Sequence, residues 1–144
     1  IISKFQCDAG QSLLSAQRQF VDHIFADGSV ETMRDRALSL AENMPHNRLL
    51  SGIVKAFETR CPMSIKLFDR LLVKADHFTD PVAAIELDFH LALRMTKRPD
   101  FAEGIRAIVI DKDQAPQWTP NSLEAVTETM LDAMFDRSGL PSLR

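Results

Sequence analysis

The sequence predicts an all-α protein with six or seven helices. Apolar residues recur at steps of three and four along most of the 144-residue chain, which is the spacing of a helix with one buried face. Ser, Asp and Pro stand where these apolar stripes begin, as they do at helix starts. No useful run alternates apolar and polar residues, and the lone strand candidate, "AIVID" at 107–111, has no partner strand. We expect one helical domain over residues 1–144.

Four helices are expected in the first half. An apolar stripe runs over 13–25, and Ser29 is the expected N-cap of a second helix that ends at Pro45. A third helix follows over about 49–60, and Pro62 begins the fourth, in the first turn where its missing N–H costs little. The residues expected to face inward are Leu13, Leu14, Phe20, Val21, Ile24, Phe25, Val30, Met33, Ala37, Leu40, Met44, Leu49, Leu50, Ile53, Val54, Phe57, Ile65, Phe68, Leu71 and Leu72.

Two further helices are expected after residue 80. Asp80 caps the first of them, Pro81 occupies its first position, and the helix runs to about Lys97. A short helix follows over 99–109. Trp118, which stands between two prolines, is expected in an extended or turn segment.

A last helix is expected to begin at Asn121 or Ser122 and to be closed by Gly139 and Pro141. Its apolar residues repeat at helical spacing. The inward-facing residues expected in this helix and in the one after Asp80 are Ile85, Phe89, Ala92, Leu93, Leu123, Val126, Met130, Met134 and Phe135.

The bulk composition excludes several classes of function. A net charge of −3 and an isoelectric point of about 5.8 argue against a nucleic-acid binder with a basic surface. No apolar run approaches the roughly 20 residues of a membrane span. Cys7 and Cys61 form no CxxC motif, which fits a reducing compartment. Because the chain begins with Ile, we expect it to be processed, truncated or cut from a longer product.

Glu86 and His90 are the strongest candidates for metal ligands, because a spacing of four places both on one helix face. Zinc needs at least three protein ligands, so His77 or Cys61 would have to complete the site. The alternative is a surface glutamate beside a partly buried histidine. The scarcity of further ligands favours that alternative, and we predict no metal site.

Cys61 is the strongest candidate nucleophile. It precedes Pro62 at an expected helix start, where the positive end of the helix dipole makes a thiol more reactive. No histidine lies near it in the sequence, and a small buried residue is the commoner role of a lone cysteine. GxSxG, HExxH and glycine-rich phosphate loops are absent, so we predict no catalytic residue in this chain.

Two rows of like charge repeat every four residues on expected helices. Each row is either a solvated face, which is the commoner case, or faces an opposite charge on the other helix or on a partner. The basic row is Lys66, Arg70 and Lys74, and the acidic row is Glu124, Glu128, Asp132 and Asp136.

The stretch "DFAEGIRAIVIDKDQAPQWTP" at 100–120 resembles the C-terminal signature of 3-hydroxyisobutyryl-CoA hydrolases, in the enoyl-CoA hydratase (crotonase) superfamily. "CPMSIKLFDRLL" at 61–72 and "AAIELDFHLALRM" at 83–95 resemble two other segments of that family, in order and spacing. The resemblance is firmest over 60–120. The matching signature residues are Asp100, Phe101, Glu103, Gly104, Arg106, Asp111, Lys112, Asp113, Pro116 and Trp118.

The resemblance implies the C-terminal helical part of an acyl-CoA thioester hydrolase of valine breakdown, on the matrix side of mitochondria or in a bacterial cytoplasm. In that family the oxyanion hole and catalytic carboxylates belong to an N-terminal spiral of βα turns, whose motifs do not occur in this chain. We therefore expect the chain to be inactive alone and to need a separate crotonase core. The alternative is a non-catalytic structural subunit of a large mitochondrial assembly, a mitoribosome or a respiratory complex. Both require a protein partner and neither requires a membrane span or direct nucleic-acid binding.

The resemblance also makes Lys112 a candidate contact to CoA. In related crotonases a lysine near this signature approaches the adenine-phosphate end of CoA, and Lys112 is its nearest counterpart. The alternative is that Lys112 pairs with Asp111 and Asp113 or lies in solvent. No cofactor is expected to be required, and a CoA thioester is the one expected ligand of an assembled complex.

The signature itself is interpreted mainly as a packing corner. Gly104 is expected to allow a close helix approach, and Trp118 to cap a core with a large buried area. The residues expected to bury one face of the short helix are Phe101, Ile105, Ile108 and Val109.

Overall fold

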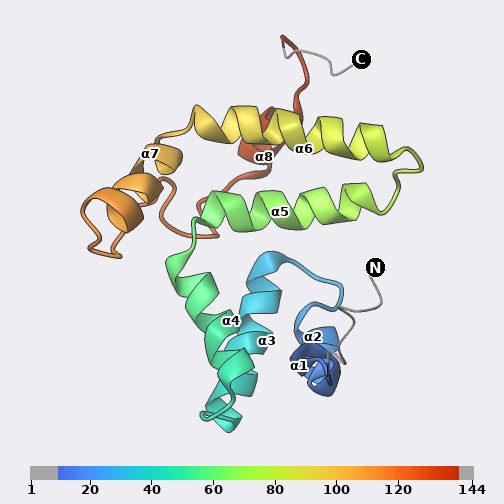
Figure 1. The fold of residues 1–144 in the computed structure, drawn as a ribbon, viewed down its shortest axis with the longest axis vertical. Helices are drawn as coiled ribbons and strands as arrows, with labels where there is room; N and C mark the ends of the chain where they lie inside the picture. The colour runs from blue at the N-terminus through green and yellow to red at the C-terminus, as the bar shows by residue number, and fades with distance from the viewer. Residues whose placement is uncertain (1–9, 140–144) are drawn as a thin grey trace, which may run out of the picture.

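Helices α3 (Val30–Asn43) and α4 (Arg48–Thr59) form the first packed pair in the computed structural model, which describes residues 10–139. Two shorter helices, α1 (Leu13–Ala16) and α2 (Arg18–Ile24), precede them, and α2 packs against α3 (Figure 1). The core of this region confirms most of the expected apolar stripe, whereas Leu14 and Phe25 are exposed and the side chain of Leu13 lies outside the described part. The fully buried residues are Ile24, Ala37 and Leu50, and Phe20, Met33, Leu40, Met44, Ile53, Val54 and Phe57 pack against them.

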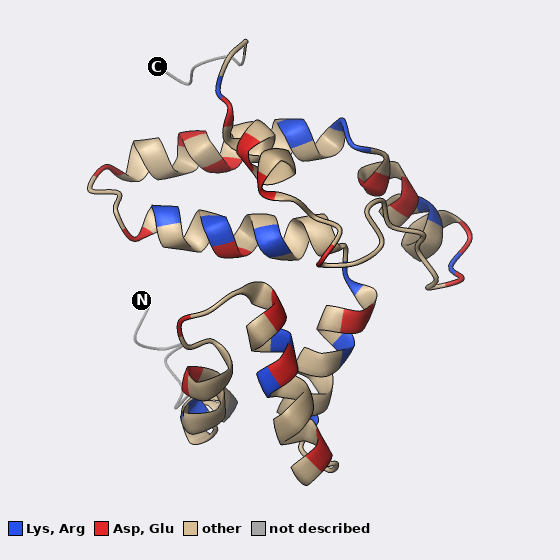
Figure 2. Cartoon of the chain, turned by 180° about the vertical axis from the view of Figure 1, so that it is seen from behind, with Lys and Arg blue, Asp and Glu red and all other residues tan. Residues whose placement is uncertain are grey.

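Helices α5 (Pro62–Ala75) and α6 (Pro81–Thr96) run antiparallel, and α8 (Glu128–Phe135) lies across one face of this hairpin (Figures 1 and 2). The three helices share a second hydrophobic core. Its buried residues are Cys61, Met63, Leu67, Leu87, Leu91, Val126, Leu131 and Met134.

Helix α7 (Pro99–Ile105) follows α6 and continues into a π-helical turn, η2 (Arg106–Ile110). The N–H of Asp111 donates to the carbonyl of Arg106 at 2.8 Å, which closes this wider turn. The chain then returns through 111–127 to the start of α5 before entering α8 (Figure 1). The strand candidate "AIVID" is therefore helical.

The all-α prediction is confirmed, with eight α-helices and one π-helical turn in place of six or seven helices, and no strand within residues 10–139. The helix starts predicted from capping residues are also confirmed. The Ser29 hydroxyl accepts a hydrogen bond from the N–H of Thr32 at 3.2 Å, and the Asp80 carboxylate accepts one from Val82 at 2.9 Å. Pro62 occupies the first turn of α5.

The predicted start of the last helix is wrong. The N-cap of α8 is Thr127, whose hydroxyl accepts from the N–H of Met130 at 3.2 Å, while 121–127 forms turns. Leu123 and Val126 are buried in those turns and lie three residues apart, which is also the spacing of apolar residues on one face of a helix. α8 ends at Phe135, before Gly139, and Pro141 lies outside the described residues.

The first predicted helix is also interrupted. Gln17 separates α1 from α2, because its ψ of 19° departs from helical geometry. The side chain of Arg36 on α3 donates to the carbonyls of Ala26 at 2.8 Å and Asp27 at 3.0 Å, in the turn that follows α2.

Several apolar residues predicted to face inward are exposed, which corrects the expected inner faces mainly of α5, α6 and α7 and also single positions in or beside α1, α2 and α8. Phe68 is 60% exposed and Ile85 is 61% exposed. Within residues 10–139, no other part of the chain covers the face of the α5–α6 hairpin opposite α8 (Figure 1). The other exposed members are Phe25, Leu14, Leu72, Ala92, Phe101, Ile105, Ile108, Val109 and Met130.

Candidate functional site

Arg106 is the centre of the signature corner. Its guanidinium donates to both carboxylate oxygens of Glu103, at 2.7 and 2.9 Å, and to Asp111 and Asp113, each at 2.6 Å. Glu103 lies one turn earlier on α7, whereas the two aspartates follow η2. The π-helical turn therefore brings three signature carboxylates around one arginine.

The same carboxylates bind the backbone of the loop that follows. Asp113 accepts from the N–H of Ala115 at 2.9 Å, and Glu103 accepts from the N–H of Gln117 at 2.7 Å. Asp100, which is 4% exposed, accepts from the N–H of Thr119 at 2.7 Å. These bonds fix the path of residues 113–119 against α7.

Asp100 is neutralised by Arg98, a residue that sequence analysis missed. The Arg98 guanidinium donates to Asp100 at 2.9 and 3.1 Å and to the carbonyl of Thr119 at 2.7 Å. Arg98 is the N-cap of α7 and Asp100 lies in its first turn, and this spacing of two is not a pattern that predicts an ion pair. A buried carboxylate needs partners of this kind, and Asp100 has both a cation and a backbone donor.

Trp118 fastens the loop to the end of α4. Its indole N–H donates to the carbonyl of Thr59 at 3.0 Å. The ring lies over Gly104, where an added Cβ would stand 3.3 Å from the indole, so a glycine suits this close approach. The close approach expected at Gly104 is thus to Trp118 itself.

The hydrogen bonds of the corner favour the charged forms of Glu103 and Asp113. The hydrogen bonds from Arg106, followed by that from the Gln117 backbone, lower the pKa of Glu103 from 4.5 to about 2. The Ala115 N–H and then Arg106 lower the pKa of Asp113, and Glu103 leads the three carboxylates that raise the pKa of Arg106. A general base needs a pKa near the working pH, so these groups are suited to structure and not to proton transfer.

Lys112 does not join this network. It is exposed, with a φ of +57°, between two aspartates whose carboxylates are bound to Arg106. For the described residues the structure gives Lys112 no ion pair with Asp111 or Asp113. Contact of Lys112 with CoA therefore stays a prediction.

Glu86 and His90 share one buried face of α6, as their spacing predicts, but the group between them is an arginine. Arg137, after α8, donates to Glu86 at 2.5 Å and to Nδ1 of His90 at 3.3 Å. Sequence analysis missed Arg137, because no local pattern links it to α6. Within residues 10–139 no three His, Cys, Asp or Glu side chains are placed to hold a metal ion.

The two charge rows meet at Arg70, the central member of the basic row, and there the second of the two interpretations is confirmed. Arg70 pairs with Asp132 at 2.6 Å and with Glu128, and thereby joins α5 to α8. Figure 2 shows the basic bands along α5 beside the acidic residues of α8. The remaining members also have partners: Lys66 with Glu31, Lys74 with the ring of Phe135, Glu124 with Arg34, and Asp136 with Arg94.

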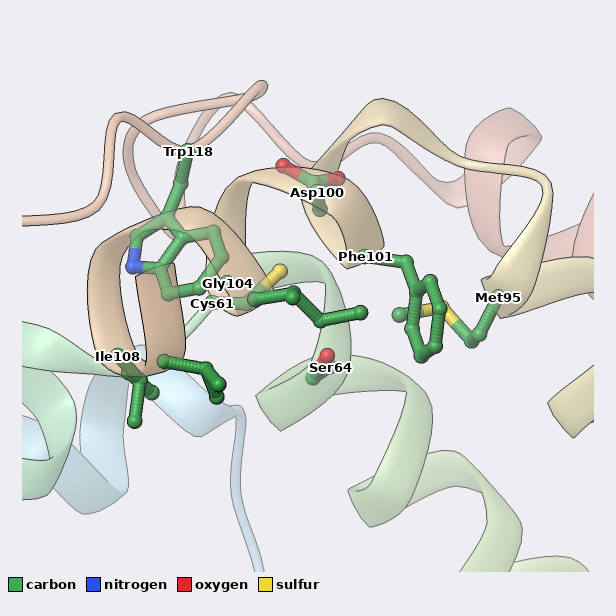
Figure 3. A pocket seen from close by; sticks show the side chains of 10 residues that line it. Cys61, Ser64, Met95, Asp100, Phe101, Gly104, Ile108 and Trp118 are labelled. Carbon is green, nitrogen blue, oxygen red and sulfur yellow. The ribbon is translucent and has the colours of Figure 1, made fainter. Parts of the chain in front are cut away.

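A cavity of about 360 Å³ opens between the start of α5, the end of α6 and α7 (Figure 3). Cys61 and Ser64 line its middle, and Trp118 lies on one side and Phe101 with Met95 on the other. Cys61 is buried in the second hydrophobic core, and Cys7 lies outside the described residues. The walls are almost entirely apolar, so the cavity offers surface for packing and few groups for chemistry.

Comparison with known proteins identifies the family of this chain. The model of the "Enoyl-CoA hydratase/isomerase" family matches residues 1–135. The chain belongs to this family. The chain is also similar to the C-terminal region of 3-hydroxyisobutyryl-CoA hydrolases.

Two relatives illustrate the match. "3-hydroxyisobutyryl-CoA hydrolase, mitochondrial" of Bos taurus is 35% identical over 91 residues, which are 63% of this chain and 23% of that protein. The protein of the same name from Danio rerio is 29% identical over 125 residues, 85% of this chain and 31% of that protein. The chain thus spans about a third or less of the length of these relatives.

Two solved structures share the fold of the described helices. An enoyl-CoA hydratase from Rhodobacter sphaeroides superposes with a TM-score of 0.78 at 24% identity, over 93% of this chain and 38% of that chain. A carnitinyl-CoA dehydratase from Mycobacterium thermoresistibile gives 0.81 at 20% identity, over 96% of this chain and 38% of that chain. In both proteins more than half of the crotonase fold lies outside the part that matches.

Proposed function

We propose that this chain is the helical C-terminal part of a 3-hydroxyisobutyryl-CoA hydrolase-like protein and completes a crotonase core carried on polypeptide outside these 144 residues. The observation that carries the proposal is the coverage of the match. The chain is similar to the C-terminal region of the named hydrolases and covers 31% of the Danio rerio protein. It would act in hydrolysis of an acyl-CoA thioester of valine breakdown.

The chemistry of the described residues supports a non-catalytic role for the chain alone. In thioester hydrolysis, water attacks the carbonyl carbon, the C–S bond breaks and the CoA thiol leaves. The reaction needs donors aimed at the developing oxyanion and a base for the attacking water. The signature carboxylates are already bound to Arg98 and Arg106, so they are unsuited to be that base.

We also propose a mitochondrial location. The Bos taurus and Danio rerio relatives carry that location in their names. No helix within residues 10–139 has the length and apolar character that crossing a membrane would require.

The test is co-expression of this chain with the part of the Danio rerio relative that precedes its matched C-terminal region. We expect the two polypeptides to co-purify and to release CoA from 3-hydroxyisobutyryl-CoA, whereas each polypeptide alone does not. A stable complex without hydrolysis favours the alternative, a structural subunit of a large mitochondrial assembly. Absence of any complex would overturn the proposal.

Lys112 is proposed to contact the phosphates of CoA in that complex. Its ammonium is exposed, and Arg106 already binds the two neighbouring carboxylates. Lys112→Ala is expected to weaken CoA binding by about tenfold, which is the loss of one charge-assisted contact of about 1.4 kcal/mol. Lys55→Ala, on an exposed face of α4, is the matched control. Equal CoA affinities in calorimetric titration of the two variants would remove Lys112 from the binding site.

A further inference from the structure

An apolar groove runs along the face of the α5–α6 hairpin opposite α8. It consists of the 360 Å³ cavity beside α7 and a second cavity of about 190 Å³ between α5 and α6, and Ser64 and Met95 line both. The two cavities are therefore adjacent. We call this surface the α5–α7 groove; its main apolar residues are Phe68, Leu71, Ala92, Met95, Phe101 and Ile105.

Large apolar side chains of the groove are exposed to solvent in the described part of the chain. Phe68 is 60% exposed and Phe101 is 47% exposed, although both lie on apolar stripes at helical spacing. The opposite face of the same hairpin is covered by α8 and held by the ion pairs of Arg70. Contiguous exposed apolar surface on a folded domain marks a place where another surface packs.

We propose that the α5–α7 groove is the surface on which the crotonase core packs. This inference rests on the proposed function, because it takes the core as the partner. The superposed solved structures support that choice: this chain accounts for 38% of each, and the rest of each chain forms the remainder of one fold. The part of the fold that lies outside this chain would cover the apolar face that is exposed here.

Charge gives the partner segment a further property. Asp88 is exposed and is the one charged side chain that lines the 190 Å³ cavity, among apolar residues of α5 and α6. A partner packed there removes water from this carboxylate, which is costly unless a cation or donor replaces it. We therefore expect the segment that enters the groove to be apolar and to place a basic or hydrogen-bond-donating side chain opposite Asp88.

The experiment uses the co-expressed complex with the Danio rerio core. Phe68→Asp and Phe101→Asp place a charge in the groove, and we expect each to lower recovery of the core at least tenfold. Val73→Asp is the matched control, since Val73 is 62% exposed on the same helix but lines neither cavity. Asp88→Lys is expected to lower recovery, whereas Asp76→Lys, at the exposed end of α5, is not.

A measurement on the unmodified chain keeps the test independent of any folding defect. Hydroxyl-radical footprinting is expected to show Phe68 and Phe101 oxidised in the free chain and protected in the complex, with Val73 oxidised in both. Wild-type recovery and unchanged footprints for the groove residues would overturn the docking surface but leave the proposed function standing. A homodimer of the free chain that Phe68→Asp dissociates would assign the groove to a second copy and overturn the inference. Failure of the wild-type chain to bind the core overturns the proposed function, and this inference with it.

Discussion

At the scale of single residues, the signature is organised by Arg106. One guanidinium binds Glu103, Asp111 and Asp113, and two of these carboxylates, Glu103 and Asp113, accept hydrogen bonds from the backbone of the following loop. Each of these acids therefore has a partner that fixes its position. The signature is a structural motif within this chain, and the acids in it are acceptors for the fold.

The first prediction concerns the pH dependence of Glu103. Its folded pKa of about 2 lies below the usual 4.5, so the unfolded state takes up a proton at higher pH than the folded state does. The stabilisation is fully present above about pH 4.5 and is lost as the pH falls toward 2. Glu103→Gln should therefore lower the urea midpoint at pH 6, and the difference from wild type should shrink steadily between pH 4.5 and 2.

The control for this prediction is Glu42→Gln, an exposed acid on α3 for which no ion pair is present in the described part of the chain. It should leave the urea midpoint nearly unchanged at both ends of that range. A constant difference between wild type and Glu103→Gln across this range would contradict the assigned charge pairing.

The sequence shows the charged residues of the signature, but its local pattern predicts only one of their ion pairs. Glu103 and Arg106 are three apart on a helix, which predicts their pairing. Arg106 reaches Asp111 and Asp113 only because η2 is a π-helical turn, and nothing local in the sequence predicts that turn. The contact of Arg137 with Glu86 joins segments 51 residues apart and needs the folded chain.

At the scale of elements, opposite charges set how α8 sits on α5. Arg70→Glu would replace two ion pairs with three acids in contact, and we expect a loss of about 1 kcal/mol, or a fall in Tm of roughly 4 °C for a chain of this size. Arg70 is 22% exposed on its side chain, so its pairs are better shielded than those on the open surface. Thermal unfolding followed by circular dichroism measures the change.

Arg18→Glu is the matched reversal on α2. Arg18 pairs with Asp22 one turn away, and both side chains are well exposed, so the expected change in Tm is within about 1 °C. If Arg70→Glu melts at the wild-type temperature, the ion pairs between α5 and α8 contribute nothing to the fold.

Helix starts were predictable where a capping side chain acts within three residues. Ser29, Pro62 and Asp80 mark the beginnings of α3, α5 and α6 as expected. The start of α8 was not, because Asn121 and Ser122 are suitable caps and the buried turn residues after them keep helical spacing. The choice of Thr127 depends on how that segment packs under α5 and α6.

At the scale of the whole molecule, apolar spacing revealed faces without revealing what covers them. Phe68, Ile85 and Phe101 were expected inside, and they are exposed in the described part of the chain. The face of the hairpin that α8 covers includes Leu67, Leu87 and Leu91, which the predicted inner faces did not include. Apolar spacing marks a stripe that becomes buried, but it does not say which element or which partner covers it; on the proposed function, the crotonase core covers the exposed stripe.

The central claim is that the groups that break the thioester bond belong to that other polypeptide. Its most direct test is the turnover of 3-hydroxyisobutyryl-CoA by the purified 144-residue chain, with free CoA thiol followed by a chromogenic disulfide. We predict a rate equal to that of buffer, and hydrolysis only after the core is added. Turnover by the chain alone at about 1 per second or faster, the range of ordinary enzymes, would contradict the account.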